Sequence, residues 1–344
     1  MSFHVMGTGS ALPARQVTND ELSEFLDTDD AWITERTGIK SRPVCTTETL
    51  DELAVAAARQ ALQRAGVTPE QLDLIICTTM SAEHASPAEA CVIQGALGAT
   101  CPAFDVNAAC AGFVFALDVA DGFFARNRAE RILVVSAEKV TRVCDWTDRA
   151  TCVLFGDGAA AAVLGQGGSS PLFLHLTTQS NTEAIHVPLP GGNSPFDERK
   201  QEGPCFLTMR GREVFKFAVT HICSEMERLA AESGVPLSDI DHFVFHQANK
   251  RIIDAGVERL GIDPTKVIVT IDHTANVSSA CIPLSLDTLA TAGQLKEGDL
   301  VALFGFGAGL VTGSALLRWE PNGPQAPTSP EAPKASADPA APQA

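Results

Sequence analysis

Positive charge is scarce in this 344-residue chain, which has 25 lysines and arginines against 42 aspartates and glutamates and a formal net charge of −17. A surface of that sign repels a phosphate backbone, so general binding to nucleic acid or anionic membranes is excluded. No uncharged apolar run reaches the ~18 residues of a membrane-spanning helix. Residues 1–7 also lack the basic and apolar regions of a signal peptide. We therefore expect a soluble, cytoplasmic protein.

No CxxC pair occurs among the ten cysteines, which are scattered among apolar neighbours. That distribution fits neither a disulfide framework nor a zinc motif. We expect reduced thiols and no metal site.

The chain divides into a body and a tail. Apolar residues make up 45% of the sequence, enough for a full-sized core, but residues 321–344 contain seven prolines, seven alanines and no large apolar residue. Such a segment cannot offset its ordering entropy, and it is predicted to be disordered. A docking peptide is the alternative for this tail.

The body repeats itself. Residues 56–79 and 225–247 both show a helical pattern, a Gly-Val turn, an aspartate and a short apolar strand. Three pairs of segments match at offsets of 168, 167 and 168, anchored by Asp73 with Asp241, Asp105 with Asp272, and Ile132 with Leu300. The sequence thus predicts two homologous halves, residues 1–165 and 166–320.

Each half alternates apolar strands with helices, which is typical of an α/β protein whose sheets are covered on both faces. Residues 73–79, 132–138 and 299–305 are predicted strands, and 51–66 and 109–126 are predicted helices. The second helix is apolar on most faces. Burying it between two sheets gives a five-layer αβαβα body.

Cys110 follows a predicted strand and opens this apolar helix within Asn107-Ala108-Ala109-Cys110-Ala111-Gly112. The positive end of a helix lowers the pKa of a thiol and favours the thiolate nucleophile. The small neighbours would let a substrate carbonyl approach. The alternative is an inert, buried cysteine.

His246 ends the predicted strand that contains Phe243 and begins the sequence His-Gln-Ala-Asn. Ligands bind at this end of strands in open α/β sheets. Zinc binding with His242 is disfavoured, because four residues along a strand separate two side chains by roughly 13 Å. A hydrogen-bonded histidine without a catalytic role is the other interpretation.

Asn276 lies in the segment that matches Cys110 in the second half, within one residue. The duplication predicts that Cys110 and Asn276 meet at helix starts, with His246 beside them. Taken alone, Asn276 reads as a helix cap. The Gly305-Phe306-Gly307-Ala308-Gly309 loop does not have dinucleotide-binding spacing, so we interpret it as an oxyanion loop or a tight strand exit.

Together these motifs resemble the β-ketoacyl-acyl carrier protein synthase III family of the thiolase superfamily, over about residues 1–320. The resemblance implies a thiolase-like fold and catalysis by Cys110, His246 and Asn276. It also implies a homodimer, the usual state of family members. Acyl-coenzyme A would acylate Cys110. A decarboxylative Claisen condensation with malonyl-acyl carrier protein would then start fatty-acid synthesis.

Further site residues follow from the resemblance alone. Trp32 would stack on the adenine of coenzyme A, with Thr28, Arg36 and Arg149 near it, and Asn249 would support the active site. Oxyanion N–H groups would come from Cys110 and from Gly307, Ala308 and Gly309. Coenzyme A is here a substrate, and no permanently bound cofactor is expected. A loop of the partner, including Ser86 and Pro87, would close the acyl pocket.

The sequence departs from the family at Ser86, where a bulky Phe is common, and before Asn276, where Thr-Ala replaces Tyr-Gly. These changes leave the primer open. The alternatives are a synthase III-like enzyme of specialised metabolism, making quinolones or polyketides or transferring acyl groups, and a non-catalytic acyl-binding paralogue.

Basic residues gather in the segments that flank His246, in spite of the acidic total. We expect this basic patch to dock the acidic carrier protein; it comprises Arg210, Arg212, Lys216, Lys250, Arg251 and Arg259.

Overall fold

Two mixed β-sheets form the body in the computed structural model, which describes residues 2–189, 196 and 205–323. The first sheet has the order β1-β7-β6-β4-β5, with bounds Phe3–Ala11, Asp157–Gln166, Arg131–Lys139, Leu74–Thr78 and Ala103–Val106. The second has the order β8-β13-β12-β11, with bounds Phe173–Asn181, Gly309–Arg318, Leu300–Gly307 and His242–Phe245. In each sheet one strand runs antiparallel to both neighbours, β7 in the first and β13 in the second.

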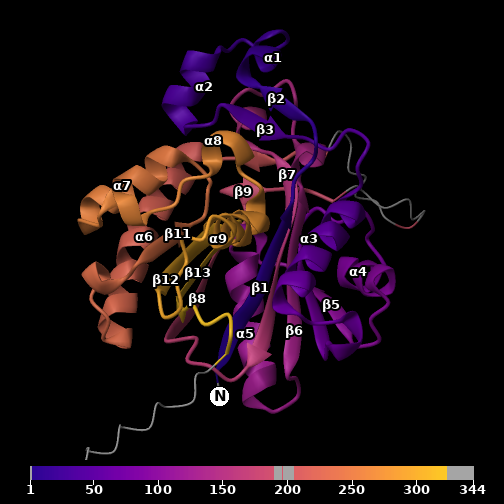
Figure 1. Cartoon of the computed structure of the whole chain (residues 1–344). Coiled ribbons are helices and arrows are strands. Elements are labelled where there is room, and N and C mark those ends of the chain that lie inside the picture. Colours follow the sequence, from indigo (N-terminus) through magenta and orange to yellow (C-terminus); the bar gives the residue numbers. More distant parts are fainter. Residues whose placement is uncertain (1, 190–195, 197–204, 324–344) are drawn as a thin grey trace, which may run out of the picture.

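Helices cover both sheets on both faces (Figure 1). Helices α3 (Leu50–Ala65) and α4 (Glu89–Leu97) pack on the outer face of the first sheet. Helices α6 (Gly211–Ser233) and α7 (Lys250–Leu260) cover the second. Between the sheets lie α5 (Gly112–Ala125) and α9 (Cys281–Thr291). The predicted five-layer αβαβα fold is confirmed.

Local sequence explains the close packing and the helix ends. A Cβ on Gly9 of β1 would lie 2.4 Å from the Ala57 carbonyl oxygen, so glycine there lets α3 lie directly on the strand. Thr49 and Glu52 form a capping box that starts α3, and Gly66 ends it with a left-handed φ of 65°. These signals place α3 within a residue of the predicted 51–66.

Equivalent aspartates, Asp73 and Asp241, accept backbone hydrogen bonds at the same position in the two sheets. The Asp73 carboxylate accepts hydrogen bonds from the backbone N–H groups of Glu130 and Arg131, at the start of β6. The Asp241 carboxylate accepts one from Leu300, at the start of β12, at 2.9 Å. Together with the common strand order, this match supports the duplication on which the fold prediction depended. The half boundaries at residues 165 and 166 stay predictions.

One matched pair of segments is wrong. Residues 104–106 belong to strand β5, but residues 271–273 lie in the short helix α8 (Ile271–Thr274). The position of β5 is taken in the second sheet by a single bridge between Val267 and Phe243. The second half has extra residues, including α8, between this bridge and Asn276, the equivalent of Asn107. These residues shift the alignment of the two halves at this segment.

Smaller elements complete the fold. Helices α1 (Asn19–Ser23) and α2 (Asp30–Thr37) lie at the top of Figure 1, with the antiparallel strand pair β2 (Gln16–Thr18) and β3 (Ser41–Pro43) that flanks them in the chain. Strands β9 (Ile185–His186) and β10 (Thr208–Met209) pair antiparallel with each other. In the described ranges, no helix is both long and apolar enough to cross a membrane. The predicted disordered tail lies, from residue 324 on, outside the described residues.

Candidate active site

A cavity of about 270 Å³ opens between the two halves and collects the predicted catalytic residues. Cys110, His246 and Asn276 all line it. His246 is 2% exposed and Asn276 5% exposed, so they lie at its inner end. Trp32, Arg36 and Arg251 line it nearer the surface, where both arginines are exposed. The structure thus brings together side chains that are far apart in the sequence.

Cys110 lies in a 3₁₀ turn (Ala109–Ala111) immediately before α5. Its Sγ atom is 3.5 Å from the Ser278 hydroxyl, to which the thiol donates. Burial raises the pKa of the Cys110 thiol to about 12. The expectation that the helix terminus lowers this pKa is therefore wrong for the free protein, because desolvation of the thiolate outweighs the helix field.

His246 follows β11 and is held by its backbone, whose N–H donates to the Phe304 carbonyl at 2.8 Å. Its ring lies edge-on to Phe306, with centroids 5.2 Å apart. Burial lowers the pKa of His246 to about 3, so the ring is neutral at pH 7. Nδ1 has no hydrogen-bond partner, so the ring is not committed to a protein group through that atom.

The second histidine of the disfavoured zinc pair points elsewhere. His242 Nε2 contacts the Asp299 carboxylate at 3.2 Å. Within residues 2–189, 196 and 205–323, no group of three or more His, Cys, Asp or Glu side chains is arranged to hold a metal ion.

Asn276 sits between α8 and α9, where its N–H donates to the Leu154 carbonyl at 2.9 Å. Its side-chain Oδ1 accepts from the Ser278 N–H at 2.9 Å. The Oδ1 atom is thus occupied, and the Nδ2 amide is the donor left for a substrate oxygen. Asn276 is not the positional counterpart of Cys110: Asn107 makes the matching bond, through its Oδ1, with the Ala109 N–H at 3.1 Å.

The glycine loop lies directly against the predicted nucleophile. A Cβ on Gly307 would come within 2.7 Å of the Cys110 backbone nitrogen. Gly307 and Ala308 line the cavity, whereas Gly309, with a φ of 144°, lies outside its lining. Only a residue without a side chain permits this approach at position 307.

Trp32 of α2 lies next to two guanidinium groups, at the outer end of the cavity. The Arg36 and Arg149 guanidinium carbons are 5.0 and 5.1 Å from its ring. Arg149 also contacts the Asp27 carbonyl and carboxylate. Thr28 lies beside Asp27 in the chain, and its buried hydroxyl has no partner. Arg149 and Thr28 do not line the cavity itself.

Asn249 ties the two sides of the cavity entrance together. It caps α7 by accepting from the Arg251 N–H at 2.9 Å, and its Nδ2 donates to the Arg36 carbonyl at 3.0 Å. This contact fixes α7 against the end of α2. The role of Asn249 as a support residue for the active site stays a prediction, and these two hydrogen bonds are consistent with it.

The docking and pocket residues lie at the surface. Arg251 alone among the predicted docking residues lines the cavity. Ser86 and Pro87 are exposed and do not line it. The side chains of all the predicted docking residues, on α6 and α7 or just before α6, are exposed: Arg210, Arg212, Lys216, Lys250, Arg251 and Arg259.

Three polar residues at the site were not anticipated from the sequence: Glu138, Ser278 and Gln247. Gln247 is fully buried, and its side-chain oxygen accepts from the N–H groups of Thr270 and Ile271. It thereby holds the segment that leads to Asn276. The repeat gave no direct signal for Ser278, because the matching turns of Asn107 and Asn276 are 169 residues apart, which places Ser278 opposite Ala109 rather than opposite Cys110.

Comparison with known proteins identifies the family of the chain. Sequence models of 3-oxoacyl-[acyl-carrier-protein] synthase III and of its C-terminal part match residues 104–182 and 230–319. The curated β-ketoacyl-[acyl-carrier-protein] synthase III of Xanthomonas campestris is 44% identical over 318 residues, covering 92% of this chain and 98% of that protein.

Solved structures give the same result. The 3-oxoacyl-[acyl-carrier-protein] synthase III of Aquifex aeolicus has a TM-score of 0.86 and 38% identity, covering 92% of this chain and all of that one. The priming β-ketosynthase of the R1128 polyketide pathway has a TM-score of 0.87 and 35% identity, covering 93% and 96%. The resemblance inferred from the motifs is confirmed: the chain belongs to the β-ketoacyl-[acyl-carrier-protein] synthase III family of acyl-transferring condensing enzymes.

Proposed function

We propose that the protein transfers an acyl group from coenzyme A to Cys110 and then to a malonyl-carrier protein. In the first step the Cys110 sulfur attacks the thioester carbonyl and coenzyme A leaves. Covalent catalysis divides one difficult carbon–carbon bond formation into two easier steps. The close contact of Gly307 with the Cys110 backbone supports an oxyanion site formed there, with N–H groups of Cys110 and Ala308 as donors.

In the second step, malonyl-acyl carrier protein replaces coenzyme A and loses CO₂. His246 and Asn276 donate hydrogen bonds to the thioester oxygen as the enolate develops. A neutral imidazole suits this task, because it carries one N–H donor and does not protonate the carbanion. The carbanion attacks the acyl-Cys110 carbonyl and gives the β-ketoacyl product.

Substrate binding uses the outer half of the cavity. Trp32 offers an aromatic face for adenine, and the nearby Arg36 and Arg149 offer positive charge for the phosphates. Coenzyme A is a substrate in this proposal, and no resident cofactor or metal takes part.

Carrier docking is assigned to the exposed basic side chains of α7 and of the start of α6, which border the cavity through Arg251. We also propose a homodimer. Strand β5 lies at the edge of the first sheet, and the exposed Ser86 and Pro87 are available to reach a partner. Buried thiols such as those of Cys77 and Cys144 suit the reducing cytoplasm.

The observation that carries the proposal is the convergence of Cys110, His246 and Asn276 on one cavity. The curated relative reported above and two others at 39% and 41% identity carry the synthase III name, and the specialised-metabolism alternative is not favoured. The test is intact-protein mass spectrometry with acyl-coenzyme A from acetyl to octanoyl. We expect one acyl mass on the wild type and none on Cys110→Ala; malonyl-carrier protein should then discharge the adduct with release of CO₂. No adduct with any primer would refute the proposal.

A further inference from the structure

A buried carboxylate lies behind the nucleophile. Glu138, near the end of β6, is 1% exposed. Its oxygens accept hydrogen bonds from the hydroxyls of Ser81, Ser278 and Ser279 at 2.6, 3.0 and 2.6 Å. The backbone N–H groups of Met80 and Ser279 also donate to it, at 3.1 and 3.4 Å. In the described part of the chain, no lysine or arginine forms an ion pair with Glu138, so hydrogen bonds alone solvate it.

One of these donors also touches the nucleophile. The Cys110 thiol donates to the Ser278 Oγ at 3.5 Å, and that hydroxyl donates to the Glu138 Oε1 at 3.0 Å. All three side chains thus form a continuous hydrogen-bonded line from sulfur to carboxylate. Ser279 reaches the same Oε1 atom but has no contact with Cys110 among its hydrogen bonds.

The thiol needs a proton acceptor. Burial raises the pKa of Cys110 to about 12, so at pH 7 the free enzyme holds it protonated. The pKa of His246 is lowered to about 3 by burial, which makes its ring a weak base. Burial also raises the pKa of Glu138, which brings this carboxylate closer to the operating pH of a general base.

We infer that Ser278 relays the Cys110 thiol proton to the Glu138 carboxylate during acyl transfer; this inference rests on the proposed function. The S–H bond breaks as sulfur bonds to the acyl carbon. Its proton moves to Ser278 Oγ, and the Ser278 hydroxyl proton moves to Glu138. When coenzyme A leaves as a thiolate, the proton returns through Ser278 to its sulfur. Glu138 is then ionised again, and the products are acyl-Cys110 and free coenzyme A.

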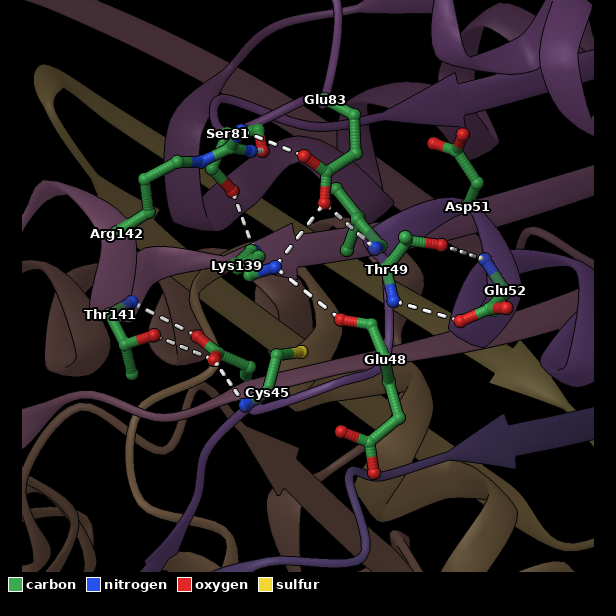
Figure 2. Close-up of polar contacts among 12 residues, drawn as sticks. Cys45, Glu48, Thr49, Asp51, Glu52, Ser81, Glu83, Lys139, Thr141 and Arg142 are labelled. Carbon is green, nitrogen blue, oxygen red and sulfur yellow. Dashed lines mark hydrogen bonds and ion pairs between the residues drawn. The ribbon is translucent and has the colours of Figure 1, made fainter.

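The surroundings of Glu138 are built to stay in place. The Ser81 hydroxyl donates to Glu138 and at the same time accepts from the Lys139 backbone N–H at 2.8 Å. Figure 2 shows the neighbouring Glu83 joined to Lys139 and Arg142. The Glu83 carboxylate also accepts from the Leu50 N–H at 3.0 Å, at the start of α3. The relay therefore ends on a fixed acceptor.

Among the described residues, the Glu138 charge acts to raise the pKa of three thiols, those of Cys77, Cys110 and Cys281. On Cys110 this charge acts to raise the pKa. A purely electrostatic role would therefore make Glu138 an inhibitor of thiolate formation, and its removal would accelerate every reaction of the thiol. A relay predicts the opposite for acyl transfer.

The test compares Glu138→Gln and Ser278→Ala with wild type and with the matched control Ser279→Ala. Two rates are measured on Cys110 between pH 6 and 9: acylation by an acyl-coenzyme A, from the intact mass, and alkylation by iodoacetamide, from the peptide mass. We expect Glu138→Gln to alkylate faster than wild type but to acylate roughly 100-fold more slowly. Its acylation rate should climb with pH without levelling off, whereas wild type and Ser279→Ala level off.

Ser278→Ala should show the same loss of acylation, and it decides the matter if Glu138→Gln does not fold. Acylation at the wild-type rate in either folded variant would overturn the relay. Failure of the proposed function has a different appearance, because wild-type Cys110 would then form no adduct at all.

Discussion

Asn107 and Asn276 occupy equivalent positions in the two halves and make the same hydrogen bond. The side-chain oxygen of each accepts from the backbone N–H two residues later, at 3.1 and 2.9 Å. The two donor residues, Ala109 and Ser278, have left-handed φ values of 45° and 47°. The turn that presents Cys110 is thus repeated, and its second copy presents Ser278 to the sulfur. The same backbone turn therefore positions both the nucleophile, Cys110, and its hydrogen-bond acceptor, Ser278.

The close approach of Gly307 to Cys110 predicts a strong effect of one methyl group. Gly307→Ala places a Cβ 2.7 Å from the Cys110 nitrogen, so the backbone must shift. We expect at least tenfold slower acylation and a loss of about 1–3 kcal/mol in unfolding free energy, measured in urea. The control is Gly95→Ala in α4, where a Cβ meets nothing within 4 Å; it should gain about 0.5–1 kcal/mol. Equal acylation by Gly307→Ala and wild type would contradict the oxyanion assignment.

His246 predicts a dependence of stability on acid. Its folded pKa of about 3 lies below the ordinary 6.5, so the unfolded chain binds the proton more readily. The stability contributed by neutral His246 is present above pH 6.5 and is lost as pH falls toward 3, by about 1.4 kcal/mol per pH unit. In urea titrations at pH 7 and 5, His246→Gln should lose less stability than wild type. Identical losses would show that the ring is not buried in solution.

Glu89, the first residue of α4, predicts the opposite dependence. Burial, with the Asp51 carboxylate adding to it, raises the pKa of Glu89 to about 8. The folded protein binds a proton on Glu89 more tightly than the unfolded chain does. Glu89 therefore contributes folding stability that is fully present below pH 4.5 and is lost as pH rises to 8. Glu89→Gln should match wild type at pH 4.5 and exceed it at pH 9, by up to ~1.4 kcal/mol per intervening pH unit. A constant difference across this range would contradict the shift.

Trp32 predicts a change in substrate affinity rather than chemistry. Its ring lies about 5 Å from two guanidinium groups and takes no part in the hydrogen bond between the Cys110 sulfur and Ser278. Trp32→Ala should raise KM for acyl-coenzyme A roughly tenfold at nearly constant kcat, because base stacking on an aromatic ring contributes about 1–3 kcal/mol. Trp32→Phe retains a ring and should fall between. A loss confined to kcat would remove Trp32 from the binding site.

Carrier docking predicts a difference between two positions on one helix. Lys216 and Arg228 are both exposed on α6, but Lys216 lies at the end near the cavity, beside the lining residues Val214 and Phe215. Lys216→Glu should weaken use of malonyl-carrier protein several-fold and reduce its dependence on salt. Arg228→Glu should not. Acylation of Cys110 by acyl-coenzyme A should stay unchanged in both, and its loss with Lys216→Glu would show a general defect.

Much of the fold follows from local sequence. The apolar runs of β4, β6 and β12 and the capping signals of α3 are properties of short segments, and periodicity detects them. The second-half alignment failed at Ile271, because a strand was replaced by the Val267 bridge and a short helix held by Gln247. No local pattern carries that information. The motifs around Cys110, His246 and Asn276, in their order and spacing along the chain, indicated the family.

The sequence by itself determined the layered α/β fold, the repeat and the identity of the three residues that line the inner cavity. Only the tertiary structure decided the state of those residues. Burial sets the pKa values of Cys110 and His246, and it depends on atoms contributed by distant segments. The contact of Cys110 with Ser278, and of Ser278 with Glu138, joins three separate elements. Protonation and hydrogen bonding are long-range properties of the fold, so composition and spacing could not supply them.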